Sequence, residues 1–443
     1  FKLTPIKRLQ SKHQDNTLQS TMNTMFSTAA KRAMRLSTQT LRTAATAAGS
    51  SPAAKPGYFL VGATAVAASA YLTSDVEAVR CETKVKIEPT GAVSVTVDST
   101  PASASKLLSV LSYSDELAKI AKTKATMPDN IAIQKFDFDY FATLNPDQQG
   151  RLLQCIKTGW ENPDSGLGCY AMAPADYDEF APYFDSVCQE YHKAGADAVH
   201  TTDWDASSVG EGGVLDVTKL GLSELSMRVR VGRNLTKFNL PGAMDKPERI
   251  EFEKAMLKAF EKLTSDPAYG GKVYSLSPDF GAGVANPNLI SPEKYDELVK
   301  AHVMFKDMDA DPYLKSAGIA SDWPYGRGCW QSDDKQCIVW FGEEDQLRIM
   351  CMKKGTRLNE VFDRLKKMLD TIESIDGIDF AVSSKYGYVT SCPSNLGTGM
   401  RASVHVRIPN LTADGTEAAA KKVCKPLGLS VRGTGGEHTP IGA

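Results

Sequence analysis

Apolar and polar residues alternate along several short segments in the second half of the chain. In 226–232, three apolar residues alternate with Arg228 and Arg230. Side chains of a strand point alternately to opposite faces, so this pattern predicts a strand with one apolar and one basic face. Segment 401–408 repeats it, with Arg401 and His405 on the basic face. Further strands are predicted at 336–341, 346–352, 385–391 and 428–432.

Apolar residues at helical spacing lie before and between these strands. Helices are predicted to begin at Ser114 and at Asn145 and to cover 176–192. Later helices are predicted at 246–264, 291–304, 357–374 and 415–426. Because helices and strands follow each other irregularly, we expect an α+β fold: a small all-α N-terminal domain and a larger domain with an antiparallel β-sheet flanked by helices.

Composition divides the chain into five segments. Up to Lys55 the chain is rich in Arg and Ser and poor in acids, which is typical of a mitochondrial transit peptide. Residues 58–72 are apolar, but shorter than the roughly 18 residues of a membrane span. We therefore predict a targeting and sorting segment for the intermembrane space; a disordered tail or a membrane anchor are the alternatives. The five predicted segments are a targeting and sorting segment 1–80, a disordered lead-in 81–113, a small helical domain 114–202, a linker 203–216 and a larger α+β domain 217–443.

The overall composition argues against several classes of protein. The net charge is −2 and the sequence pI about 6.4, so no basic excess indicates a nucleic-acid partner. The 9 cysteines contain no CxxC pair, which favours free thiols over a disulfide scaffold or a zinc site.

The arginines are concentrated locally and indicate an anion. Arg348 and Arg432 follow apolar runs and join the strand arginines Arg228, Arg230 and Arg401. Basic faces brought together would repel each other unless an anion lay between them, and guanidinium groups bind phosphate bidentately. The chain has neither GxxxxGK[ST] nor a strand-to-helix GxGxxG, so arginines on strands would bind a polyphosphate without a glycine cradle. Half-exposed strands with solvated arginines are the alternative.

Three consecutive acids, 343–345, lie in a predicted turn between two strands. Adjacent carboxylates make each other harder to ionise, which a solvated turn tolerates. The functional interpretation is that one carboxylate meets a cationic substrate while another organises Mg²⁺ through water.

Three loops add candidate chemistry. Cys392 ends a predicted strand and enters a turn rich in glycine and hydrogen-bond donors, where a thiolate of lowered pKa or a small buried apolar residue are both possible. Loop 432–439 is Gly-rich, carries Glu437 and His438, and suits a lid. Glycines in 164–170 expose backbone to a close ligand.

Taken together, these motifs resemble the phosphagen (guanidino) kinases. Cys392-Pro-Ser-Asn-Leu-Gly-Thr398 matches that family's signature, and Trp323-Pro-Tyr-Gly-Arg327-Gly and Arg432-Gly-Thr-Gly-Gly match further motifs. The resemblance covers about 114–443 and implies that 114–202 is a substrate-specificity domain and 217–443 a catalytic ATP-binding domain. It implies a glutamine-synthetase/guanidino-kinase-like fold, ATP and ADP as nucleotides, Mg²⁺ as cofactor, and reversible transfer of the ATP γ-phosphoryl group to a guanidine nitrogen.

The resemblance also implies roles for single residues. The residues that it implies bind the nucleotide phosphates are Arg228, Arg230, Arg348, Arg401 and Arg432. Those lining the rest of the nucleotide are His302, His405 and His438. Those of the substrate-specificity loop are Ser165, Gly166, Leu167 and Tyr170. Those for catalysis and for holding the guanidinium are Glu344, Glu437 and Cys392, with Glu344 as the base. No residue is expected to bind Mg²⁺ directly; Glu343 is expected to meet its waters.

The loop 165–170 and Glu437-His438 resemble arginine kinases, so we expect L-arginine as the acceptor, with taurocyamine open. A protein-arginine kinase, or a family member with a structural role and impaired catalysis, would also carry many of these motifs. Gln346 and Gly342 depart from the residues common in the family. The family commonly continues beyond the position of Ala443, so we expect the chain to be truncated. Contact with the inner-membrane surface and homo-oligomers fit the family.

Overall fold

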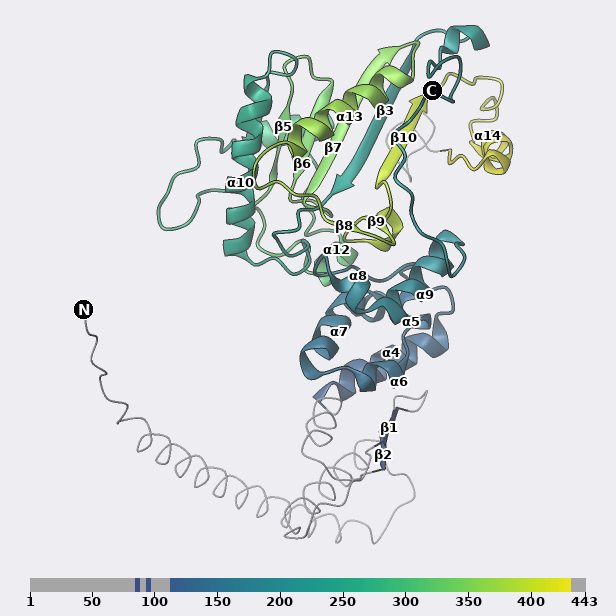
Figure 1. Ribbon diagram of the computed structural model, residues 1–443, viewed down its shortest axis with the longest axis vertical. Helices are drawn as coiled ribbons and strands as arrows, with labels where there is room; N and C mark the ends of the chain where they lie inside the picture. Colours follow the sequence, from purple (N-terminus) through teal and green to yellow (C-terminus); the bar gives the residue numbers. More distant parts are fainter. Residues whose placement is uncertain (1–83, 88–92, 97–111, 432–443) are drawn as a thin grey trace, which may run out of the picture. The chain divides into compact units, whose positions relative to one another are not determined.

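The computed structural model describes residues 84–87, 93–96 and 112–431 (Figure 1). The predicted targeting segment and the loop 432–439 lie outside the described residues. Contacts divide the chain into two units, one of Phe1–Lys84 with Thr96–Ser103 and one of Val85–Val95 with Ala104–Ala443. The helices and the large sheet discussed below all belong to the second unit. No helix among the described residues is long and apolar enough to cross a membrane.

Two short strands lie in the segment 81–113, where the sequence predicted no element. They are β1 (Lys84–Ile87) and β2 (Val93–Thr96), which pair as a two-stranded sheet.

The helical part packs around a core of aromatic and aliphatic side chains. Its helices are α4 (Ser114–Thr126), α5 (Ile131–Gln134), α6 (Phe138–Thr143), α7 (Pro146–Glu161), α8 (Asp176–Glu179) and α9 (Ala181–His192). A capping box between Asn145 and Gln148 begins α7 at the predicted position. The helix predicted over 176–192 is two helices. Phe180 leaves the helical conformation between them, and Pro182 opens α9, because proline suits a first turn and breaks an interior.

A six-stranded antiparallel sheet forms the centre of the larger part, in the order β10-β3-β7-β6-β5-β4. Its strands are β3 (Leu225–Arg233), β4 (Lys272–Ser275), β5 (Gly328–Gln331), β6 (Cys337–Phe341), β7 (Leu347–Gly355) and β10 (Met400–His405). The predicted antiparallel sheet flanked by helices is confirmed.

Different helices lie against the two faces of the sheet, and the edge strand β10 is exposed along its whole length. The helices α10 (Lys246–Ser265) and α13 (Asn359–Glu373) lie against one face, which carries Met227, Val229 and Val231 (Figure 1). The other face packs Ile338 and Met350 against the segment that contains α11 (Pro292–Lys300) and α12 (Pro312–Ser316). The remaining helices of the described residues are α14 (Ala418–Cys424), η1 (Val217–Leu220), η2 (Pro393–Asn395) and η3 (Lys425–Leu427).

Several predicted element bounds were wrong. In 385–391 only β9 (Gly387–Tyr388) forms, paired with β8 (Val382–Ser383), and 428–431 is not a strand. The helix predicted over 291–304 ends at Lys300. The short strands β4 and β5 were not predicted.

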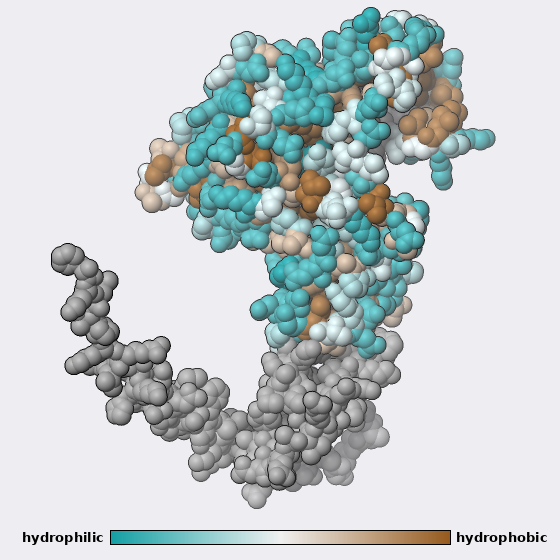
Figure 2. All heavy atoms as spheres, in the orientation of Figure 1, coloured by the Kyte–Doolittle hydropathy of each residue, from teal (hydrophilic) through white to brown (hydrophobic). Residues whose placement is uncertain are grey.

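The surface is largely hydrophilic in the view of Figure 2. Its largest apolar group in that view lies over α14, where Val423, Leu427 and Leu429 are exposed.

Candidate active site: an arginine face beside a buried acidic turn

Three neighbouring strands bring the predicted phosphate-binding arginines together. Arg230 on β3 is directly opposite Arg401 on β10, and Arg228 is opposite Ser403. On the other side of β3, Arg348 of β7 is opposite Gly232, two residues from Arg230. Residues paired across antiparallel strands share a face, and so do residues two apart. The four described arginines therefore lie on one face, away from α10 and α13.

This face carries more positive charge than its protein surroundings neutralise. Burial, followed by the charges of Arg348, Arg228 and Arg401, lowers the pKa of Arg230 to about 9. Burial and the same kind of repulsion lower the pKa of Arg228, whose buried Nε has no hydrogen-bond partner among the described residues. Both groups stay cationic at neutral pH. An anion bound among them would relieve the repulsion and satisfy the free donor, so the face fits a polyphosphate.

Arg348 connects the arginine face to the acidic turn. Its Nε donates to Oε2 of Glu343 at 2.8 Å, and its Nη2 lies 3.3 Å from Oε2 of Glu344. Burial lowers the pKa of Arg348, but the neighbouring carboxylates outweigh it and raise the pKa overall.

Glu344 is held largely out of water, with its side chain 20% exposed. Its pKa is raised to about 7, mainly by burial and then by the charges of Asp345 and Glu343. The charges of Arg348 and Arg230 lower it, but by less. A carboxylate with this pKa accepts a proton readily near neutral pH. The solvated-turn alternative is therefore wrong for Glu344.

Sequence reasoning missed the residues that hold the acidic turn. Buried Asp345 accepts from the backbone N–H of Ser391 at 2.7 Å and from Nδ2 of Asn234 at 2.8 Å. The side chain of Gln346 accepts from Leu235 N at 2.8 Å and donates through Nε2 to a backbone carbonyl at the same distance. Gln346 thus has a positioning role that its departure from the family pattern did not suggest.

Cys392 lies next to the acidic turn but is not a low-pKa thiol. Burial and the charge of Glu344 raise its pKa well above the usual value. Its Sγ lies 3.0 Å from Oγ of Ser394, and that contact lowers the pKa only in part. The predicted thiolate of lowered pKa is therefore wrong for the protein without a bound cation. Arg233, also missed, donates to the carbonyl of Thr398 at 2.7 Å and fixes the end of this turn.

In the predicted specificity loop, residues 165–167 form backbone hydrogen bonds to neighbouring segments, whereas Tyr170 lies in the candidate site. The carbonyls of Gly166 and Leu167 accept from Ile131 N and Ala132 N at 3.1 and 2.9 Å, which ties the loop to the start of α5. Ser165 donates its backbone N–H within the loop, to Asn162 O. Tyr170, by contrast, belongs to the candidate site. Burial raises the pKa of its hydroxyl, and the charges of Cys392 and Glu344 raise it further, so the hydroxyl is influenced by both of these site residues.

Not every predicted residue joins this cluster. His405 is exposed on β10, in register with Ser226. His302 is exposed just after α11 with a φ of 56°, and within the described part of the chain no hydrogen bond or ion pair of its side chain connects it to the arginine face. Arg432, Glu437 and His438 lie outside the described residues. No group of three or more metal-ligating side chains occurs in the described part of the chain.

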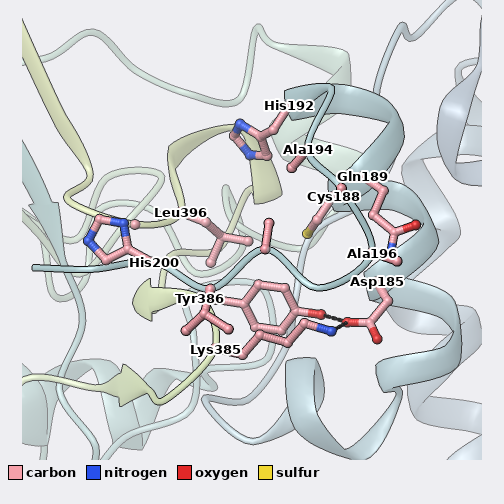
Figure 3. A pocket seen from close by; sticks show the side chains of 14 residues that line it. Asp185, Cys188, Gln189, His192, Ala194, Ala196, His200, Lys385, Tyr386 and Leu396 are labelled. Atoms are coloured by element: carbon pink, nitrogen blue, oxygen red, sulfur yellow. Dashed lines mark hydrogen bonds and ion pairs between the residues drawn. The ribbon is translucent and has the colours of Figure 1, made fainter.

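A cavity of about 240 Å³ lies elsewhere. It opens between α9 and 385–397 and contains none of the predicted site residues (Figure 3). Asp185 accepts from the hydroxyl of Tyr386 and, at 2.8 Å, from Nζ of Lys385 on its wall. His192 and His200 face the same hollow (Figure 3). This cavity borders the turn after Cys392 through Leu396.

Comparison with known proteins matches both parts of the chain. The model of the ATP:guanido phosphotransferase C-terminal catalytic domain matches residues 251–442, and that of the N-terminal domain matches 138–189. The arginine kinase Oct f 2 of Amphioctopus fangsiao is 38% identical over 307 residues, which cover 69% of this chain and 82% of the relative. The chain belongs to the ATP:guanido phosphotransferase family. As a member, it is a guanidino phosphotransferase, a phosphagen kinase.

Comparisons with further relatives and solved structures also match phosphagen kinases. An arginine kinase of Turbo cornutus is 37% identical over 66% of this chain and 75% of its own length. The substrate-free duplicated taurocyamine kinase from Schistosoma mansoni matches with a TM-score of 0.60 and 30% identity, over 72% of this chain. This phosphagen kinase spans 43% of that duplicated chain. A lombricine kinase structure matches with a TM-score of 0.59 and 27% identity, over 72% of this chain and 85% of its own.

Proposed function

We propose that this phosphagen kinase transfers the γ-phosphoryl group of ATP reversibly to the guanidine of L-arginine and so buffers cellular ATP. One observation carries the proposal: an arginine face with an unsatisfied buried donor lies next to a buried carboxylate of pKa about 7. The first suits a triphosphate and the second suits a guanidinium. The arginine-kinase relatives favour arginine as the acceptor.

The proposed roles of the site residues follow from their charges. Arg228, Arg230, Arg348 and Arg401 would hold the phosphates and stabilise charge on the transferred group. Glu344 would orient the planar guanidinium and accept its proton as the new P–N bond forms. Since phosphoryl transfer needs little covalent assistance, alignment of the two substrates provides most of the rate enhancement.

Cys392 and Tyr170 would complete the acceptor side. A bound guanidinium next to Cys392 adds a positive charge, which works against the burial and the Glu344 charge that raise its pKa. Arg432, Glu437 and His438, outside the described residues, remain proposed for the phosphates, the guanidinium and a closing lid. His302 and His405 remain proposed for the nucleotide.

Mg²⁺ is proposed to enter with the nucleotide and to supply positive charge to the phosphate oxygens. Glu343 is the carboxylate proposed to meet the metal's water ligands. Its side chain is 18% exposed and forms an ion pair with Arg348, whose guanidinium belongs to the arginine face.

Taurocyamine is the second candidate acceptor, favoured by the structural match to the duplicated taurocyamine kinase. Steady-state rates with ATP and Mg²⁺ on L-arginine, taurocyamine and lombricine would decide. We expect the highest kcat/KM on L-arginine. A higher value on either of the other two would reject arginine as the substrate, and no transfer to any of the three would favour a structural role.

The cellular context is proposed from residues outside the described ones. The segment 1–80 would direct the protein to the mitochondrial intermembrane space, where it could contact the inner-membrane surface and form homo-oligomers. A fusion of 1–80 to a fluorescent protein tests this. Uniform cytosolic fluorescence would contradict it.

A further inference from the structure

Two cysteines that the phosphotransfer chemistry does not use face each other inside the large sheet. Cys337 begins β6 and Cys351 lies directly opposite on β7. Both side chains are fully buried, and their Sγ atoms are 3.5 Å apart. The pair is in the reduced, free state.

The register of the two strands places this pair where a disulfide forms with little movement. The next pair along, Gln336 and Met352, is hydrogen-bonded, because Met352 N donates to Gln336 O at 2.7 Å. Hydrogen-bonded and non-hydrogen-bonded pairs alternate in an antiparallel ladder, so Cys337 and Cys351 form a non-hydrogen-bonded pair. In such pairs the Cα atoms are about 4.5 Å apart, within the range of disulfides, and the side chains are closest. Only the sulfur atoms must approach, to about 2.05 Å.

A cation next to the pair favours ionisation of one thiol. Arg364, on α13, pairs with Asp334 at 2.6 Å and donates to Oε1 of Gln336 at 3.1 Å, in the turn that leads into Cys337. The hydrogen bond from Cys351 lowers the pKa of Cys337, burial opposes the shift, and the charge of Arg364 assists it. The thiolate is the form of cysteine that reacts with oxidants. The Arg364 side chain is 25% exposed, so this cation contacts solvent on one side and lies near the buried pair on the other.

We propose that Cys337 and Cys351 form a reversible disulfide when the protein meets hydrogen peroxide. The Cys337 thiolate takes one oxygen atom from the peroxide and becomes a sulfenic acid, and the second peroxide oxygen leaves as water after protonation. The Cys351 thiol then attacks that sulfur, the S–S bond forms and a second water leaves. The two thiols lose two electrons and the peroxide gains them. The bond closes the β6–β7 hairpin that carries Glu343 and Glu344.

Tryptic mapping tests the pairing on the full-length protein, because cleavage after Lys335, Arg348 and Lys353 separates the two cysteines. Cys337 falls in peptide 336–348 and Cys351 in peptide 349–353. After treatment of the folded, reduced protein with hydrogen peroxide, we expect these two peptides as one cross-linked species that dithiothreitol splits. We also expect a higher Tm for the oxidised protein, since the cross-link restrains its unfolded state.

Two variants make the test specific. Cys351→Ser should lose both the cross-link and the rise in Tm. Cys329→Ser, at a buried cysteine on β5 opposite Trp340, should keep both. Peptide 336–348 recovered unlinked or as sulfinic acid from the wild-type protein would overturn the proposal. So would its cross-linking to another cysteine, or a cross-link without a rise in Tm. The wild-type map gives its answer even if a variant fails to fold.

Discussion

At the scale of single residues, Glu344 has the pKa that a general base needs near neutral pH. Its value of about 7 means that acid protonates it well before an ordinary glutamate. For transfer from ATP to arginine the base must be ionised, so kcat/KM should be constant above about pH 7 and fall as the pH drops below it. Glu344→Gln should lower turnover by about 10²–10³ and remove that dependence.

Steady-state kinetics across pH, with a coupled assay of ADP release, checks this prediction. Glu251→Gln is the matched control, because the Glu251 side chain is 61% exposed and its ion pair is with Lys237. It should behave like the wild type. Turnover of Glu344→Gln close to normal would show that another group accepts the proton.

Cys392 is the second residue with a definite expectation. Its thiol is buried beside Glu344 and hydrogen-bonds Ser394, so Cys392→Ser keeps the size and one contact but removes an ionisable sulfur. We expect slower turnover with an unchanged unfolding temperature, measured by kinetics and calorimetry on the same sample. Kinetics identical to the wild type at every pH would instead leave Cys392 a buried packing residue.

Which residues converge could be predicted from the sequence, but their electrostatic state could not. Strand periodicity placed Arg228 and Arg230 on one face, because that information is local. The raised pKa of Cys392 depends on burial and on Glu344, which is far from it in the sequence. Asn234 hydrogen-bonds Asp345 from a distant strand end, and no local pattern marks it.

At the scale of elements, the arginines of β3 repel one another and lie on the face away from α10 and α13, so we expect the fold not to depend on them. Arg230→Ala should abolish transfer and weaken ATP binding strongly, because one of four converging cations is lost. The fold should be as stable as the wild type or slightly more, since the substitution relieves repulsion by Arg228, Arg348 and Arg401. Calorimetric titration with ATP and thermal unfolding together check both parts.

Arg357→Ala is the control for that experiment. The Arg357 side chain is 56% exposed, and its Nε lies 4.0 Å from Oδ2 of Asp216. Its removal should therefore change neither nucleotide binding nor transfer. If Arg230→Ala bound ATP and turned over like Arg357→Ala, the arginine face would not be the phosphate site.

The acidic turn depends on a glycine at its start. Gly342 has a φ of +74°, and a Cβ there would lie 2.0 Å from the carbonyl oxygen of Gly326. Both the positive φ and this close approach favour glycine at this position. Gly342→Ala should destabilise the protein by roughly 1–3 kcal/mol and displace Glu343 and Glu344. Stability in denaturant and turnover should therefore both fall.

Gly377→Ala separates the destabilisation due to the positive φ from that due to the contact with Gly326. Gly377 has a similar φ of +80°, but a Cβ there would meet nothing within 4 Å. Its loss of stability should reflect the backbone conformation alone and be smaller, with normal turnover. Equal losses at both positions would rule out the contact with Gly326.

Long elements with regular patterns were predictable, and short ones were not. The strands β3 and β7 and the helices α10 and α13 show a clear period. The four-residue strands β4 and β5 are too short to show one, and they form because long-range pairing completes the sheet. The segment 385–391 looked like a strand, yet it turns at Gly387, whose φ is +75°.

At the scale of the whole second unit, the helical part is attached to the segment that carries Cys392. Ala171 N donates to the carbonyl of Ser391 at 2.7 Å, and the hydroxyl of Tyr177 donates to that of Thr390 at 2.9 Å. His192 hydrogen-bonds the carbonyl of Pro393 at 2.8 Å. These contacts join residues about 200 positions apart, so they were beyond prediction from local patterns. Because Tyr170 directly precedes Ala171, they hold it close to the segment that carries Cys392, and through them the helical part would contribute to the proposed substrate recognition.

Tyr177 tests this link, because its ring is fully buried and its hydroxyl bonds a fully buried carbonyl. Tyr177→Phe leaves the ring in place and the carbonyl of Thr390 without that donor, so it should destabilise the protein by about 1–3 kcal/mol. Since Thr390 lies two residues before Cys392, KM for the guanidino substrate should rise while the affinity for ATP stays unchanged. Tyr191→Phe, at a side chain 42% exposed on the same helical part, should change neither quantity. Denaturant unfolding and titrations of both substrates check the prediction. If Tyr177→Phe had the same KM and stability as Tyr191→Phe, the helical part would not position the segment around Cys392 through this bond.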